Sequence, residues 1–80
     1  MDDDLEVPVT YKNEELIFIA KFIQFGYTYR FAVDVNGILV FFEPDEERNF
    51  RVIIDPSIDI RKIDRELIEL IMASLTVMMK

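Results

Sequence analysis

The sequence predicts an α+β fold, in which an antiparallel β-meander of four to five strands carries one C-terminal helix packed on one face. Three observations lead to this fold class. Over residues 27–35 the residues alternate between two faces with a period of two, which is typical of a strand. Asn36-Gly37 separates this run from the apolar run 38–42, and this dipeptide is the strongest short-range signal for a hairpin. From about residue 59 the apolar period changes to 3.6, which indicates a helix.

Five segments have the composition of strands, and polar or turn-forming residues separate them. The first segment contains Pro8, which lacks an N–H and therefore suits an edge strand. The acidic residues 1–6 that precede it are expected to form a disordered tail, so that residues 7–80 make up a single domain. The expected strands are residues 7–11, 16–23, 27–35, 38–42 and 50–54.

The hairpin around Asn36-Gly37 has a defined register, because a two-residue loop sets the pairing of the strands that flank it. Phe31 is then expected opposite Phe42 on the face that the helix covers. On the reverse face Arg30 meets Glu43, an opposite-charge pair worth about 0.2–1 kcal/mol. The agreement of both faces with one pairing supports the predicted hairpin.

The helix expected from about residue 59 to Met79 carries two apolar stripes side by side. Either Asp59 or Asp64 can cap its start, and Asp64 is the better candidate. Core packing explains the second stripe, and the alternative is that the stripe forms a further contact surface. That contact surface would use Ile68, Met72 and Met79.

The chain contains no cysteine and no histidine. It therefore has no thiolate nucleophile, no imidazole base and none of the usual transition-metal ligands. Gly26 and Gly37 are its only glycines, and they lie too far apart to form a phosphate-binding loop. We expect no enzyme activity, no cofactor, and no catalytic, cofactor-binding or metal-binding residues.

The distribution of charged and apolar residues argues against nucleic acid and membrane as partners. The net charge is −7 and the nine basic residues are scattered, whereas nucleic-acid binding depends on clustered Lys and Arg. No apolar run approaches the roughly 20 residues that a membrane-spanning helix needs. The acidic start is unlike a signal peptide, so that a cytoplasmic location is expected.

Both faces of the expected sheet are apolar, although a sheet with a helix on one face usually presents a polar face to solvent. The register of strand 16–23 is open at this point. It adds either Ile17 and Ile19 or Leu16 and Phe18 to the open face, and the first pair joins that face if Lys21 points away from the core. In that register Lys21 lies near Arg30, a like-charge contact. The charged rim would consist of Lys21, Arg30, Asp34, Glu43 and Arg51.

An exposed apolar patch with a polar rim is typical of an interaction site. We therefore expect a non-enzymatic protein-interaction or self-association module, with a homodimer packed sheet face to sheet face as the simplest closed form. One alternative is a set of scattered surface hydrophobic residues, which are ordinary on any protein. A second alternative is an N-terminal segment folded over this face. The expected interface residues are Ile17, Ile19, Ala32, Leu39, Phe41 and Ile53.

The acid-rich loop supports an alternative function. A small acidic regulator or nucleic-acid mimic could dock on a basic protein partner through it. Acid–base catalysis is not expected there, because a solvated turn offers no cleft in which the pKa values of two carboxyl groups become different. The spacing of the acidic residues is also not that of a calcium-binding loop. The expected docking residues are Glu43, Asp45, Glu46 and Glu47. A small pocket could be lined by Tyr11, Tyr27, Tyr29, Lys21 and Arg30. Packing between the strands is the simpler explanation of these side chains and needs no pocket.

Three segments together resemble a small uncharacterised bacterial protein family: Gly26–Arg30, Val35–Gly37 and Phe42–Arg51. The similarity covers about residues 16–54. It implies a natural cytosolic protein of one domain. Because that family has no assigned activity, the resemblance implies no site and no substrate.

Overall fold

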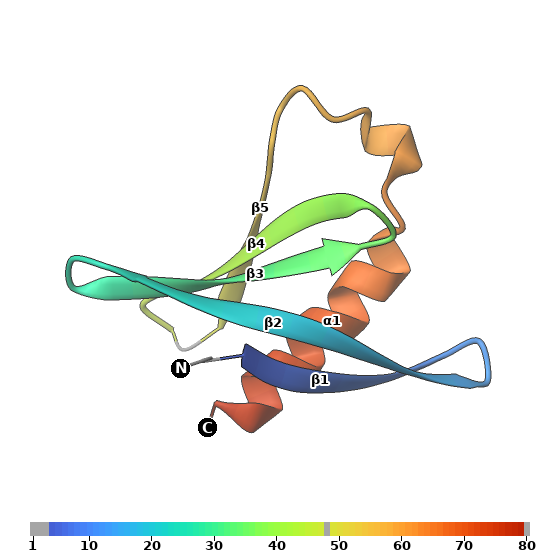
Figure 1. Cartoon of the computed structure of the whole chain (residues 1–80), viewed down its shortest axis with the longest axis horizontal. Coiled ribbons are helices and arrows are strands. Elements are labelled where there is room, and N and C mark those ends of the chain that lie inside the picture. Colours follow the sequence, from blue (N-terminus) through green and yellow to red (C-terminus); the bar gives the residue numbers. More distant parts are fainter. Residues whose placement is uncertain (1–3, 48, 80) are drawn as a thin grey trace.

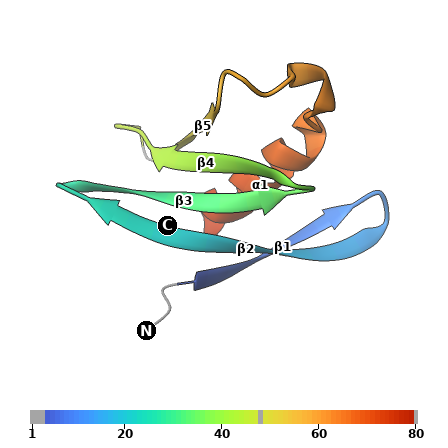
Figure 2. The same cartoon turned by 45° about the horizontal axis from the view of Figure 1, so that its top comes forward.

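The computed structural model describes residues 4–47 and 49–79 of the chain. Five strands form one antiparallel sheet in the order β1-β2-β3-β4-β5, followed by one helix, so that the predicted meander with a C-terminal helix is confirmed. Figure 1 shows the helix crossing one face of the twisted sheet, and Figure 2 shows it behind β3 and β4. The elements are β1 (Asp4–Tyr11), β2 (Glu14–Phe25), β3 (Thr28–Val35), β4 (Ile38–Pro44), β5 (Phe50–Ile54), a 3₁₀ turn (Ile60–Lys62) and α1 (Arg65–Met78).

The turn between β3 and β4 has the geometry that the sequence predicts. Asn36 and Gly37 have φ angles of 53° and 87°, as a type I′ turn requires at both central positions. The carboxylate of Asp34 accepts the Gly37 N–H at 2.7 Å, which further stabilises the turn. Phe31 pairs with Phe42, so that the predicted register is confirmed.

The first strand begins earlier than the sequence indicates. Residues 4–6 belong to β1 and pair with residues 19–21 of β2, so that their assignment to a disordered tail was wrong. Acidic composition alone suggests solvation, whereas the neighbouring strand supplies backbone partners and places Lys21 opposite Asp4. Residues 1–3 of the expected tail lie outside the described part of the chain.

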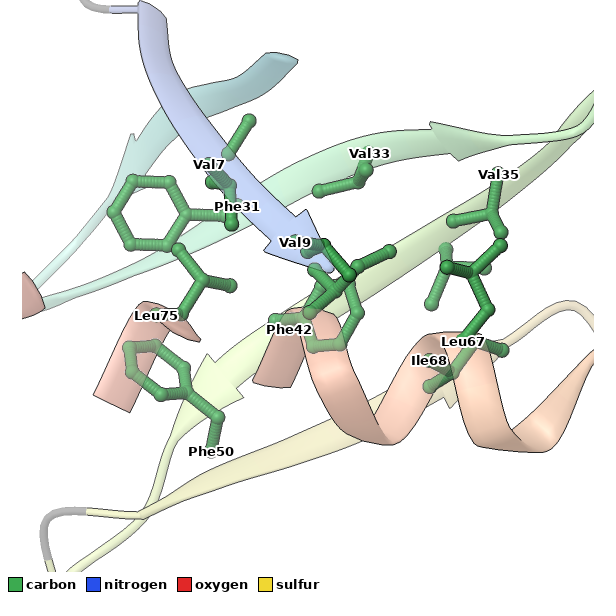
Figure 3. Packing of buried hydrophobic residues seen from close by; sticks show 13 residues of the cluster. Val7, Val9, Phe31, Val33, Val35, Phe42, Phe50, Leu67, Ile68 and Leu75 are labelled. Carbon is green, nitrogen blue, oxygen red and sulfur yellow. The ribbon is translucent and has the colours of Figure 1, made fainter. Parts of the chain in front are cut away.

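The hydrophobic core lies between the sheet and α1. Alternate residues of every strand point towards the helix, since successive side chains of a strand lie on opposite faces. In Figure 3, Leu67, Ile68 and Leu75 of α1 face the sheet. The buried residues of this cluster are Val7, Val9, Ala20, Phe31, Val33, Val35, Val40, Phe42, Phe50, Leu67, Ile68, Ile71 and Leu75.

The helix begins at the cap that the sequence favours. Asp64 is the N-cap residue, and its carboxylate accepts the Leu67 N–H at 3.2 Å. Asp59, the alternative candidate, instead accepts the backbone N–H of Arg61 at 3.0 Å and forms an ion pair with its guanidinium. The cap therefore separates the 3₁₀ turn from α1.

Two side-chain hydrogen bonds hold α1 against β1, the strand to which its backbone lies closest. The Tyr11 hydroxyl donates to the Asp64 carboxylate at one end of the contact. Further along, the Ser74 hydroxyl donates to the Pro8 carbonyl at 3.0 Å. The sequence pattern placed Ser74 on the apolar stripe but gave no sign of this backbone contact.

We expect the stability of the fold to depend on Asp64 below about pH 4. The hydrogen bonds from the Tyr11 hydroxyl and the Leu67 N–H lower the pKa of Asp64 from its ordinary value. A lowered pKa in the folded state stabilises the fold above the ordinary pKa, and this contribution is lost as the pH falls through the folded-state value. Asp64→Asn keeps a capping side chain that does not titrate.

Thermal unfolding of the wild type and Asp64→Asn at pH 6 and pH 3 measures this contribution. The wild type should lose more stability between the two pH values than Asp64→Asn does. Tyr11→Phe, which removes the hydroxyl donor, should fall between them. An equal loss in the wild type and Asp64→Asn would show that the Asp64 carboxylate does not carry the effect.

Candidate interaction face

The face of the sheet that points away from α1 is called the open face here, and it contains the residues predicted for an interface. The structure settles the register of β2: Leu16 and Phe18 pack against the core, whereas Ile17 and Ile19 are exposed. Lys21 lies opposite Ala32, and Ile23 lies opposite Arg30, so that Lys21 is not directly paired with Arg30.

The six predicted interface residues differ in how much of each is accessible. The exposed fractions of Ile17, Ile19 and Leu39 are 63%, 48% and 52%. Phe41 and Ile53 are half-buried, and Ala32 is only 9% exposed. The accessible apolar surface is therefore carried mainly by β2 and by the start of β4, and not by Phe41.

Phe41 is partly covered by a charged side chain from the neighbouring strand. The guanidinium of Arg30 lies 5.1 Å from the centroid of the Phe41 ring. Arg30 also forms an ion pair with Glu43 at 2.7 Å, and Arg51 of β5 reaches the other oxygen of that carboxylate at 3.2 Å. Three of the five residues expected to form a rim, Arg30, Glu43 and Arg51, thus form a row across β3, β4 and β5 that holds Arg30 over the ring.

The exposed apolar surface consists of two strips, with Asp34 of β3 between them and Lys21 of β2 in line with the first strip. One strip is Ile17 and Ile19 on β2. The other is Leu39 on β4, together with the accessible parts of Phe41 and Ile53. Lys21 and Asp34, both exposed, belong to β2 and β3 on the same face. Asp4 and Glu6 of β1, which are also exposed, lie opposite Lys21 and Ile19 on this face. A surface that covers both strips therefore meets Lys21 together with several carboxylates.

The predicted acidic docking loop is shorter than expected. Glu43 belongs to β4 and its carboxylate is bound by two arginines, so that its assignment to the loop was wrong. The carboxylate of Asp45 accepts the N–H groups of Glu47 and Asn49, each at 2.9 Å, and so shapes the turn. The side chains of Glu46 and Glu47 are exposed.

An open hollow of about 700 Å³ lies between this loop and the turn that joins β2 to β3. Tyr27, which is fully exposed, and Tyr29 line it together with Arg51 and the acidic loop residues. Of the residues considered for a small pocket, Tyr27 and Tyr29 line this hollow, whereas Tyr11 lies at α1 beside Asp64. Lys21 and Arg30 do not line the hollow.

Residues 4–47 and 49–79 contain neither a metal-binding cluster nor a membrane-spanning helix. No three His, Cys, Asp or Glu side chains in these ranges are grouped so that they could hold a metal ion. In the same part of the chain, no helix has the length and apolar character needed to cross a membrane.

The chain was also compared with known proteins. No protein-family model, no curated protein and no solved structure matches it. The resemblance to an uncharacterised bacterial family therefore stays a prediction.

Proposed function

We propose that this chain is a non-enzymatic interaction module whose open face packs against a protein surface, with a second copy of the chain as the occupant. The observation that carries the proposal is the exposure of Ile17, Ile19 and Leu39 on the face that α1 does not cover. Large apolar side chains gathered on one face and bordered by charges are typical of interaction sites.

The charges on the open face favour a second copy as the occupant. A two-fold contact is reciprocal: if one residue of the first copy contacts a second residue of the other copy, the second residue of the first copy contacts the first residue of the other. Lys21 of one copy can therefore face Asp34 of the other, and the reverse contact occurs at the same time. Such a contact would cover both apolar strips and pair Lys21 with Asp34 twice.

Ile17→Glu tests the open face in solution. Because Ile17 is 63% exposed, the charge should leave the fold intact and disrupt the contact between copies. We expect the mass measured by light scattering to fall to half that of the wild type. Val77→Glu is the matched control, since Val77 on α1 is 67% exposed but lies outside the open face. Phe41→Glu is less suitable because Arg30 covers the ring.

Two outcomes would contradict the proposal. A wild type with the mass of one chain at all micromolar concentrations would exclude self-association. An equal fall in mass for Ile17→Glu and Val77→Glu would show that the open face is not specific.

The hollow beside the acidic loop supports a second candidate function, docking on a basic partner. Exposed carboxylates from Glu46 and Glu47 and the ring of Tyr27 meet there, and carboxylates and aromatic faces both attract Lys and Arg side chains. Salt distinguishes the two candidates. Docking through exposed charges weakens as ionic strength rises, whereas an apolar contact persists.

A further inference from the structure

The two edges of the sheet differ in how well they are protected. In β1 the two-residue turn at Lys12 and Asn13 makes Tyr11 and Glu14 the first hydrogen-bonding pair with β2. Pro8 therefore directs its backbone outward, but it has no N–H, and its carbonyl accepts the Ser74 hydroxyl. Proline and a covering helix are devices that protect sheet edges from pairing.

The edge formed by β5 has neither device. The Asp45 N–H donates to the Asn49 carbonyl at 2.8 Å, and hydrogen-bonding pairs alternate along an antiparallel ladder. Arg51 and Ile53 therefore bond to β4, and the other three residues direct their N–H and C=O groups outward. β5 is the last strand of the sheet, and α1 lies closer to β1 than to β5. The outward-facing residues are Phe50, Val52 and Ile54.

We propose that the β5 edge pairs with the β5 edge of a second copy, antiparallel and about a two-fold axis at Ile53. This contact goes beyond the proposed function and does not depend on it, because it uses the strand edge and not the open face. It would join two sheets of five strands into one continuous sheet, with both helices on the same side.

The side chains select this register over its neighbours. With the axis at Ile53, Arg51 of one copy lies opposite Asp55 of the other, the residue that directly follows β5, and this opposite-charge pair occurs twice. Within each chain the Arg51 guanidinium also reaches Glu43, and the Asp55 carboxylate also accepts the Ser57 N–H, so that the new pair adds to these contacts. Val52 then lies opposite Ile54 on the helix side, where both are half-buried. An axis at Val52 would instead place Arg51 opposite Ile53, and an axis at Ile54 would place Ile53 opposite Asp55. Only the register centred on Ile53 pairs charge with charge and apolar residues with apolar residues.

Amide hydrogen exchange tests the pairing directly. In the proposed register, the Val52 and Ile54 amides of each copy donate to the other copy, whereas those of Arg51 and Ile53 donate to β4 within the chain. We expect Val52 and Ile54 to become protected as the protein concentration rises, with Arg51 and Ile53 protected throughout. Exchange rates of Val52 and Ile54 that do not depend on concentration would overturn the proposal.

Asp55→Arg tests the register. It places Arg51 opposite an arginine in both pairs, and we expect dimerisation through the edge to weaken by roughly tenfold or more, because attraction becomes repulsion twice. Glu69→Arg, the same charge change at an exposed position of α1, should have no effect. If Asp55→Arg fails to fold, the exchange measurement on the wild type still decides. Dimerisation equal to that of the wild type in a folded Asp55→Arg would exclude this register.

The edge contact and the open-face contact can be separated by mass. A closed assembly that uses both contacts contains four chains, and Ile17→Glu or Asp55→Arg each reduces it to two. If only Asp55→Arg halves the mass, the edge contact is supported and the open-face contact fails. If only Ile17→Glu halves it, the reverse holds.

Discussion

Phe42→Ala should lower the free energy of unfolding by about 3–5 kcal/mol, the usual cost of removing a buried phenylalanine ring. Phe42 is 0% exposed and belongs to β4, which has a neighbouring strand on each side. Its ring lies in the core cluster opposite Phe31, so that the cavity left behind has packed neighbours on several sides. A domain of this length has a total stability of about 4–12 kcal/mol, and the substitution therefore removes a large share of it.

Urea denaturation followed by circular dichroism measures this effect. Tyr27→Ala is the control, because Tyr27 is fully exposed and exposed substitutions usually change stability by no more than about 0.5 kcal/mol. Phe41→Ala should fall between the two, since its ring is half-buried on the opposite face of the same strand. A Phe42→Ala protein as stable as Tyr27→Ala would contradict the placement of Phe42 in the core.

Glu43→Ala should destabilise the fold by about 1–3 kcal/mol, the cost of leaving a largely desolvated polar group without its hydrogen-bonding partner. The Glu43 side chain is only 14% exposed, and its two oxygens bind Arg30 and Arg51. Removal of the carboxylate takes the ion pair from Arg30, whose side chain is 27% exposed and lies over Phe41. The cost arises because the packing of Arg30 over Phe41 on the open face limits its access to water.

Arg51→Ala provides the matched comparison for Glu43→Ala. The Arg51 side chain is 65% exposed, and an exposed ion pair contributes no more than about 1 kcal/mol. We therefore expect the midpoint of urea unfolding to fall clearly for Glu43→Ala and only slightly for Arg51→Ala. Equal effects would mean that the contact between Arg30 and Glu43 adds nothing beyond an ordinary surface pair.

Local rules account for the parts of the fold that the sequence predicted correctly. The turn at Asn36 and Gly37 needs two residues that tolerate positive φ, and both are adjacent in the chain. That turn then sets which residues of β3 and β4 pair. The cap at Asp64 likewise depends on a carboxylate three residues before the N–H that it accepts.

The composition of the open face was also predictable, but its accessibility was not. The period of two identifies which residues share a face, and Ile17, Ile19 and Leu39 are exposed. The position of Arg30 over Phe41 depends on three strands that bring Arg30, Glu43 and Arg51 together. No spacing within one strand reveals that arrangement.

The sequence by itself therefore determined the element order, the tight hairpin and the helix cap, because each depends on residues close together in the chain. Only the tertiary structure decided the start of β1 at Asp4, the register of β2 and the difference between the two sheet edges. These features depend on pairing and coverage by distant segments, such as the contact of Ser74 with Pro8 across 66 positions. The same long-range contacts close the β1 edge and leave the β5 edge and the open face accessible.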